Sequence, residues 1–223
     1  MTRPCHRVHH VVFRLRRLQA LQGAGLIRPV TMTPLPYTPP LPSSLPEELL
    51  PLSWLIGRWA GVGLGHYPTI EDFRFGQEVV FSTDGRPFLH YSSRSWLLDD
   101  AGNRIRPAGT ESGYWRPRPD NEVEITLAHP TGFAEIWVGT VEVLGLADAA
   151  ITSARATLRT DVVTRTASAK PYESGERLYG LVNGELMWTF DMAAMGESMT
   201  NHLSARLKPA DGGDSEDISA DGD

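Results

Sequence analysis

From Phe73 to about Leu207 the chain alternates between short strand-like segments and turn residues. The first segment has the period of two typical of a β-strand, with apolar side chains on one face at Phe73, Phe75, Val79 and Phe81. The strongest hairpin signal is Asn183-Gly184, because this pair readily takes the positive φ angles of a type I′ turn. The pattern predicts roughly eight to ten short antiparallel strands, with no helix among them.

The later segments predicted to be strands are PFLHYSSRSWLL, ESGYWRP, VEITLAHP, AEIWVGTVEVLG, ITSARATLRT, ERLYGLV, ELMWTFDMA and HLSARL. The edge strands of a sheet with so many strands must be protected, either in a sandwich or in a closed barrel. The sequence pattern does not distinguish these two folds. Several segments carry apolar side chains on both faces, as in Trp137 beside Val138. We expect this where one face meets a core and the other a cavity, and a barrel of this kind can hold a ligand of modest size.

A short helix is expected before the strands. Ser44-Leu45-Pro46-Glu47 has the pattern of a capping box with proline in the first turn. The apolar-rich EELLPLSWLIG that follows predicts one or two helical turns, and Pro51 limits their length.

The next stretch, GRWAGVGLGHYPTI, contains glycine at positions 57, 61, 63 and 65. A dinucleotide-binding loop needs a strand before the glycines and a helix after them, and a P-loop needs Gly-Lys-Ser/Thr. Here the expected order is the reverse and no such lysine is present, so phosphate binding is disfavoured. The stretch instead predicts a strand that begins near Trp59, whose glycines allow a sharp bend or the close approach of a ligand to the backbone. We expect Trp59 to pack as an aromatic plug at the base of the barrel.

The two flanks differ from the central part in composition. Residues 1–31 contain six arginines and no acid, and the stretch after Lys208 contains six acids and no base. We expect 1–45 to be a basic and then proline-rich disordered extension, 46–208 the barrel and 209–223 a disordered acidic tail. The basic part is interpreted as a disordered arm or as upstream sequence before a start at Met32, and a loose metal site at His6, His9 and His10 is disfavoured.

The central part has 15 basic and 21 acidic residues, which argues against nucleic-acid binding. Cys5 is the one cysteine, so neither an internal disulfide nor a cysteine-based metal site is expected. No apolar run is long enough for a membrane span and no secretory signal is evident, so a cytoplasmic location without membrane association is predicted. A homodimer is left open.

The glycine-rich stretch and several later segments resemble the nitrobindin family of haem-binding β-barrels. The similar segments are GRWAGVGLGHYPTI, EVVFSTDGRPFLHY, SGYWRP, ITLAHPTGFAEIWVGT and NHLSARL, which together span about residues 46–208. The resemblance implies an all-β fold, a closed antiparallel up-and-down barrel of about ten strands with a short N-terminal helix. It also implies one non-covalent haem b per chain.

By position, the family's axial histidine falls on His202, and we carry over Thr69 and Lys170 as further haem contacts. From strand parity alone His202 faces solvent, because it shares a face with Ser204 and Arg206. His129 either lines the distal side of the haem or ends a strand.

The resemblance implies that ferric haem binds nitric oxide and isomerises peroxynitrite to nitrate, with no catalytic residue beyond the iron. An alternative is a carrier of a fatty acid or another small apolar molecule, in which Arg94 or Arg206 would hold a carboxylate. A third hypothesis is a nitric oxide sensor that acts on a partner through its charged flanks.

Overall fold

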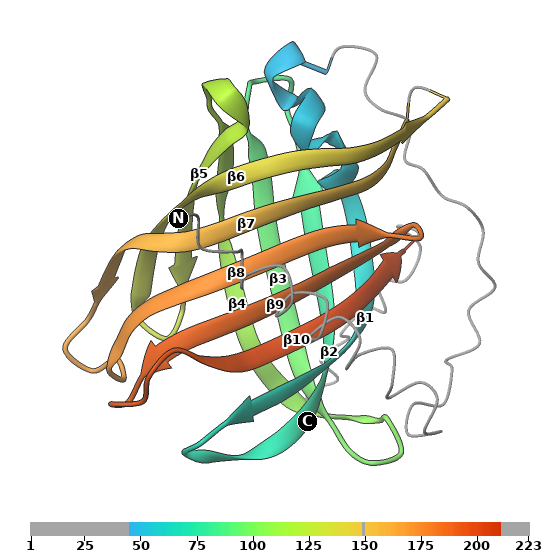
Figure 1. The fold of residues 1–223 in the computed structure, drawn as a ribbon. Coiled ribbons are helices and arrows are strands. Elements are labelled where there is room, and N and C mark those ends of the chain that lie inside the picture. Colours follow the sequence, from blue (N-terminus) through green and yellow to red (C-terminus); the bar gives the residue numbers. More distant parts are fainter. Residues whose placement is uncertain (1–44, 149, 211–223) are drawn as a thin grey trace, which may run out of the picture. The chain divides into compact units, whose positions relative to one another are not determined.

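The computed structural model describes residues 45–148 and 150–210, and they form ten strands and two short 3₁₀ helices (Figure 1). In chain order these are η1 (Glu47–Leu55), β1 (Gly57–Tyr67), β2 (Ile70–Ser82), β3 (Leu89–Leu98), β4 (Arg104–Pro117), η2 (Pro119–Asn121), β5 (Glu122–His129), β6 (Phe133–Ala147), β7 (Ala150–Arg165), β8 (Tyr172–Val182), β9 (Glu185–Ala194) and β10 (Thr200–Pro209).

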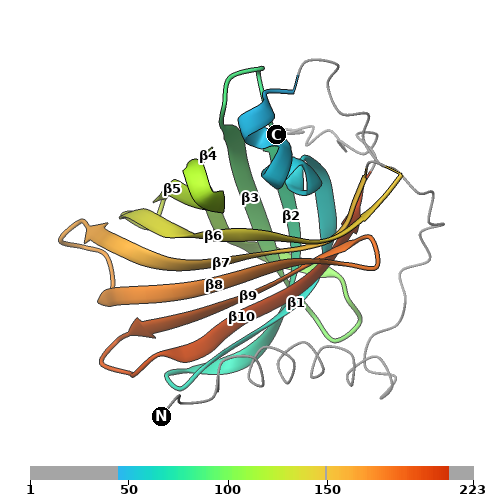
Figure 2. The same ribbon diagram turned by 45° about the horizontal axis from the view of Figure 1, so that its top comes forward.

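The strands form one closed antiparallel barrel in which each strand pairs with its neighbours in sequence. The barrel closes between β1 and β10, where Trp59 pairs with Pro209 and Gly65 with Leu203 (Figures 1 and 2). Closure pairs both edges of the sheet, which removes the edge-strand problem that a sandwich would keep. The predicted all-β up-and-down barrel of about ten strands is therefore confirmed, and the sandwich alternative is wrong.

One end of the barrel is filled by η1 and a tightly packed core. Helix η1 packs against β4, β6 and β7, and four of its side chains are buried: Leu49, Leu52, Trp54 and Leu55. Trp59 is also buried, and its indole Nε1 donates a hydrogen bond of 2.8 Å to the carbonyl of Leu55. The expected structural role of Trp59 at this end is confirmed.

The two short helices differ in detail from the expectation. Helix η1 is a 3₁₀ helix with Pro51 inside, and its N-cap is Pro46, which makes no side-chain cap. Ser44, the expected capping residue, lies outside the described residues. The three-residue helix η2 was not expected. It begins at Pro119 and is too short to produce a helical periodicity in the sequence.

The hairpin signals of the sequence agree with the backbone. Asn183 and Gly184 have φ angles of 52° and 75°, and they join β8 to β9 as the tight turn that the sequence predicts. This turn therefore sets the register in which Val182 pairs with Glu185.

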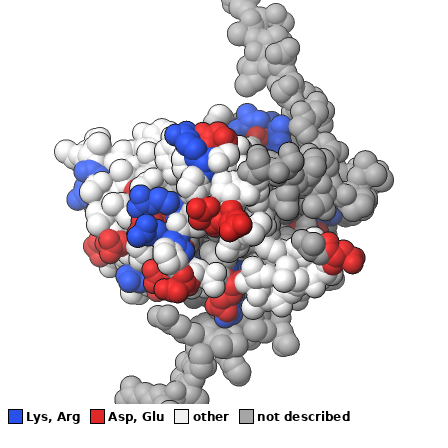
Figure 3. Space-filling view, turned by 90° about the horizontal axis from the view of Figure 1, so that it is seen from above, with Lys and Arg blue, Asp and Glu red and all other residues white. Residues whose placement is uncertain are grey.

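Nearly all of both flanks, including Cys5 and the three N-terminal histidines, lies outside the described residues, so the expectations for them stay predictions. In the part of the chain that the structure describes, no helix has the length and hydropathy of a bilayer span. The face drawn in Figure 3 carries basic and acidic side chains interspersed with one another.

Candidate functional site

A cavity of about 350 Å³ lies inside the barrel near the turns β5–β6, β7–β8 and β9–β10. In an up-and-down barrel these turns lie at the opposite end from η1. The cavity reaches the surface, because exposed residues such as Thr131 and Lys170 contribute to its lining. One part of its wall is apolar and is formed by Phe73, Phe75, Phe190, Met192 and Leu203. The other part is polar and includes Gln77, Ser93, Glu111, His129, Glu135 and Arg177.

The aromatic part of the wall explains two glycines of β1. Gly63 pairs across the strands with Phe75, and Gly65 with Phe73. A Cβ added at Gly63 would lie 2.2 Å from the Phe75 ring, and one at Gly65 would lie 2.0 Å from the Phe73 ring. The rings therefore lie directly on the β1 backbone, which is possible only because no side chain stands there. These glycines make room for aromatic rings of the protein itself.

His202 reaches the cavity because β10 contains a bulge. Asn201 pairs with Asp191 and Leu203 pairs with Phe190, so His202 has no partner on β9. A bulge inserts one extra residue and breaks the alternation of faces at that point. His202 lines the cavity together with the adjacent Leu203. The parity-based expectation that His202 faces solvent is therefore wrong, since parity assumes an unbroken strand.

The surroundings of His202 hold its ring in place and define its tautomer. Nδ1 lies 3.1 Å from the carbonyl oxygen of His66 and must donate to it, because a carbonyl can only accept. The rings of Tyr67, Phe73 and Phe190 contact the imidazole with centroid separations of 5.4, 6.2 and 6.1 Å. Burial lowers the pKa of His202, so the neutral ring is favoured and Nε2 keeps its lone pair.

The other two predicted site residues differ in their relation to the cavity. Lys170, in the loop between β7 and β8, is exposed and lines the cavity. Thr69 is an exposed residue of the turn between β1 and β2 and does not contribute to the cavity lining. The structure thus brings Lys170 and His202 to one cavity, and places Thr69 in the hairpin that carries His66.

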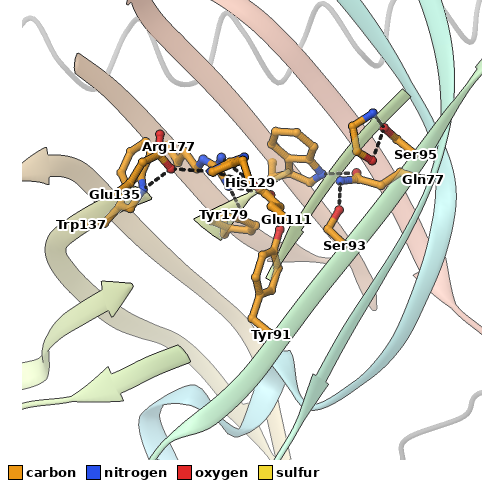
Figure 4. Close-up of polar contacts among 12 residues, drawn as sticks. Gln77, Tyr91, Ser93, Ser95, Glu111, His129, Glu135, Trp137, Arg177 and Tyr179 are labelled. Atoms are coloured by element: carbon orange, nitrogen blue, oxygen red, sulfur yellow. Dashed lines mark hydrogen bonds and ion pairs between the residues drawn. The ribbon is translucent and has the colours of Figure 1, made fainter. Parts of the chain in front are cut away.

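The polar part of the wall centres on a buried ion pair (Figure 4). Arg177 of β8 donates two hydrogen bonds to Glu111 of β4, of 2.9 and 2.8 Å, and Tyr91 donates one of 2.5 Å to the same carboxylate. Burial alone would raise the pKa of Glu111, but the charge of Arg177 and its hydrogen bonds outweigh burial and lower it to about 2. Glu111 is therefore ionised at neutral pH.

A second carboxylate lies next to this pair. Glu135, 4% exposed, accepts hydrogen bonds of 2.9 Å from His129 and 2.9 Å from the indole of Trp137. Burial raises the pKa of Glu135, but the bond to His129 and the charge of Arg177 lower it overall. His129 is the last residue of β5, as one of the two readings expected, and it also lines the cavity. That it lines the distal side of a haem stays a prediction.

Two arginines that the carrier hypothesis placed inside the barrel lie on its outside. Arg94 pairs with Glu78 at 3.2 Å, and Arg206 pairs with Glu185. Both alternate along their strands with buried inward residues, such as Ser93 beside Arg94. The expectation that either holds a ligand carboxylate is wrong. Among the described residues the buried cation is Arg177, whose two terminal nitrogens both bond to Glu111 while its Nε has no hydrogen-bond partner.

The sequence-based reading missed most of the polar wall. A signal was present, because Gln77 and Glu135 each stand between apolar or aromatic residues two positions away, and Arg177 stands between Gly175 and Tyr179. A polar side chain on the inward parity of a strand is expected to be buried and paired. The partner of each could not be read, because partners lie on strands that are distant in sequence.

The donor set of the cavity fits a metal that brings most of its own ligands. His202 offers one neutral imidazole nitrogen, flanked by aromatic rings. No cluster of three or more His, Cys, Asp or Glu side chains suited to a metal ion occurs among residues 45–148 and 150–210. A porphyrin supplies four nitrogens to its iron, needs apolar walls for its faces, and requires one further ligand from the protein.

Comparison with known proteins identifies relatives along the whole barrel. The family model described as a THAP4-like, heme-binding beta-barrel domain matches residues 48–208. A protein of Nocardioides sp. strain ATCC BAA-499 / JS614 named peroxynitrite isomerase is 50% identical over 167 residues, covering 75% of this chain and 96% of the relative. A ferric nitrobindin-like protein of Streptomyces griseus subsp. griseus is 45% identical over 168 residues, covering 75% of this chain and 84% of the relative.

A solved structure is also similar. The crystal structure of Rv2717c from M. tuberculosis superposes with a TM-score of 0.68 at 36% sequence identity, and it covers 75% of this chain and 99% of that one. The similarity therefore extends over the entire barrel of that protein.

Proposed function

Because the chain belongs to the family of THAP4-like, heme-binding β-barrel domains, we propose that it binds one haem b non-covalently in this cavity, where His202 would hold the iron. The observation that carries the proposal is the bulge at His202, which turns this imidazole into the cavity with Nδ1 bonded to a carbonyl. A ligating histidine is commonly oriented in this way, by a hydrogen bond from its other nitrogen. The resemblance to nitrobindins is confirmed by the named relatives.

The remaining contacts follow from the chemistry of the cavity. Phe73, Phe75 and Phe190 supply apolar surface for the faces of the macrocycle. Lys170 at the entrance would pair with a propionate as a point charge. We retain Thr69 as a second propionate contact, because its turn lies beside the site at the β1–β2 hairpin.

We further propose that the loaded protein binds nitric oxide and isomerises peroxynitrite to nitrate. When bound, the ferric iron supplies the coordination chemistry of this reaction. His202 holds its lone pair available at neutral pH, and the aromatic wall excludes water from one side of the site. The isomerisation neither gains nor loses a proton, which agrees with the ionised state of Glu111 and Glu135. Support for the activity comes from relatives named peroxynitrite isomerase at 44–50% identity.

The carrier hypothesis now has less support. A fatty-acid carrier needs a buried cation free to hold a carboxylate, whereas Arg177 is bonded to Glu111 through two of its nitrogens. A third hypothesis, a nitric oxide sensor acting on a partner through the flanks, concerns residues outside those described.

The test is a haem titration of the wild type, His202→Ala and His90→Ala, followed by absorption spectroscopy. His90 lies on the outside of β3, where it pairs with Asp84 at 3.6 Å, and serves as the matched control. We expect a saturable Soret band in the wild type and in His90→Ala, and a weakened or shifted band in His202→Ala. An unchanged band in His202→Ala would exclude His202 as the ligand.

The activity is tested by stopped-flow decay of peroxynitrite with the same three proteins. Loading with haem should accelerate the decay and raise the yield of nitrate in the wild type and in His90→Ala. If decay by the loaded wild type equals that of the apoprotein, the isomerase proposal is wrong even where haem binding is confirmed.

A further inference from the structure

A continuous row of buried Trp and Tyr rings leads from the cavity wall into the core. Trp188 lines the cavity and stacks on Tyr179, with ring centroids 6.1 Å apart and an interplanar angle of 23°. Tyr179 contacts Trp115 at 5.2 Å, and Trp115 contacts Tyr91 at 6.4 Å. All four side chains are buried. Neighbouring ring centroids along this row are 5.2 to 6.4 Å apart, so each electron-transfer step between rings is short.

Tyr91 differs from the other rings because its phenol is hydrogen-bonded to a group that can accept its proton. Its phenol donates a hydrogen bond of 2.5 Å to Glu111, the short length typical of a bond to an ionised acceptor. A phenol that loses an electron becomes strongly acidic. Oxidation of a buried tyrosine is therefore favourable only where a neighbouring group can take the proton, and Glu111 is already in position.

The other rings in the row can pass an electron but lack a base. The indole N–H of Trp188 donates to the amide oxygen of Gln77 at 2.8 Å, and an amide is a poor proton acceptor. The phenolic oxygen of Tyr179 faces the Arg177 guanidinium at 3.4 Å, which cannot accept a proton.

Trp137 has a carboxylate partner, Glu135, but its ring lies under a cation. The guanidinium carbon of Arg177 is 4.9 Å from the centre of the Trp137 ring. A cation over a ring opposes formation of a positive charge on that ring. Trp137 is therefore a less favourable end point than Tyr91.

The charges around Tyr91 also favour the loss of an electron. Two carboxylates, Glu111 and Glu135, lie together with the Arg177 guanidinium and the His129 imidazole in a largely buried cluster (Figure 4). Removing an electron from Tyr91 and moving its proton to Glu111 replaces one of the two neighbouring carboxylates by a neutral acid. Electrostatic interactions between these side chains are stronger than at the surface, because the carboxylates of Glu111 and Glu135 and the guanidinium are largely buried.

We propose that Tyr91 is a redox-active tyrosine that, with Glu111 as its proton acceptor, traps one-electron oxidants that reach the cavity. With nitrogen dioxide as the oxidant, one electron passes from Tyr91 through Trp115, Tyr179 and Trp188 and reduces it to nitrite. The phenolic O–H bond breaks, and the proton forms a new O–H bond on the Glu111 carboxylate. The products are nitrite, a neutral tyrosyl radical and a carboxylic acid, with one electron and one proton transferred.

The test uses the full chain without added haem. A negative result here therefore leaves the haem proposal standing, and failure of the haem proposal leaves this one standing. A photogenerated ruthenium(III) trisbipyridine complex serves as the one-electron oxidant. Samples are frozen after the flash and examined by electron paramagnetic resonance. Because Tyr91 is 3% exposed, a radical on it must arrive through the protein. We expect a tyrosyl signal in the wild type and in Tyr114→Phe, an exposed tyrosine on the outer face of β4.

In Tyr91→Phe we expect this signal to be lost and replaced by a tryptophanyl radical. Persistence of the same tyrosyl signal in Tyr91→Phe, or only tryptophanyl radicals in the wild type, would overturn the proposal. In Glu111→Gln the radical should form more slowly than in the wild type, and without the solvent deuterium effect that proton transfer to Glu111 produces.

If circular dichroism shows that Tyr91→Phe does not fold, high-field electron paramagnetic resonance of the wild-type radical decides the question. A radical with one strong hydrogen bond from a carboxylic acid supports Tyr91. A radical hydrogen-bonded to bulk water, as expected for Tyr114, contradicts it.

Discussion

Replacing Glu111 by glutamine should destabilise the fold in a pH-dependent way. Glutamine keeps the shape of the side chain and can still accept from Tyr91, but it removes the carboxylate that is directly paired with the buried Arg177 guanidinium. The pKa of Glu111 falls from 4.5 in the unfolded chain to about 2 in the fold. Each tenfold change in acidity corresponds to about 1.4 kcal/mol, so the ionised carboxylate stabilises the fold by about 3 kcal/mol at neutral pH. Removing one partner of a buried pair typically costs about 3–5 kcal/mol, which agrees.

The sign of the pH dependence follows from the lowered pKa. A carboxyl whose folded pKa lies below its unfolded value stabilises the fold fully above about pH 4.5, and this stabilisation is lost as the pH falls toward about 2. The difference in unfolding free energy between wild type and Glu111→Gln should therefore be largest near neutral pH and shrink over that interval. Urea unfolding followed by tryptophan fluorescence, at a series of pH values, measures it.

Two control variants sharpen this experiment. Glu176→Gln removes an exposed carboxylate from β8 and should change stability by less than about 0.5 kcal/mol. Glu111→Gln combined with Arg177→Met removes both members of the pair and should cost less than Glu111→Gln alone, because no guanidinium is left without its direct partner. A loss below about 1 kcal/mol in Glu111→Gln, or the same loss at every pH, would refute the reasoning.

Three further predictions concern the cavity. In Gly65→Ala the new Cβ meets the Phe73 ring at 2.0 Å, so the ring should turn into the cavity. Haem titration should then show weaker binding, and the fold should lose about 1–3 kcal/mol of stability. Unchanged haem affinity would contradict the role assigned to this glycine. Because burial lowers the pKa of His202, the Soret band should persist to lower pH than for free imidazole bound to haem, and a pH titration of the loaded protein checks this. Tyr67→Phe removes the hydroxyl that accepts from the buried Ala194 N–H at 2.9 Å and should lower the unfolding free energy by about 1–3 kcal/mol, whereas a loss within error would mean that water replaces the hydroxyl.

The fold could be predicted because its determinants are local. The period of two, the turn residues and the Asn183-Gly184 hairpin each act over a few neighbouring positions, and the structure follows them. Closure of the barrel was not local, since it depends on pairing between β1 and β10, and only the family resemblance indicated it.

The candidate site was harder to predict than the fold, because its contacts join residues that are distant in sequence. His202 was identified by resemblance, while strand parity pointed outward, because a bulge cannot be recognised from alternation alone. The pairing of Arg177 with Glu111 joins residues 66 positions apart, so no local spacing in the sequence predicts it. Sequence patterns therefore locate the inward face of each strand but not which polar side chains meet there.

The bulge in β10 has a consequence for how such barrels change over evolutionary time. The residues after it, Ala205 and Leu207, keep their alternation, and their pairing with β1 is regular. Loss of the single extra residue would restore a plain strand without moving the rest of the sheet. A lineage could thus acquire or discard the imidazole that we propose as the iron ligand by one codon inserted or deleted, while the barrel around it stayed the same.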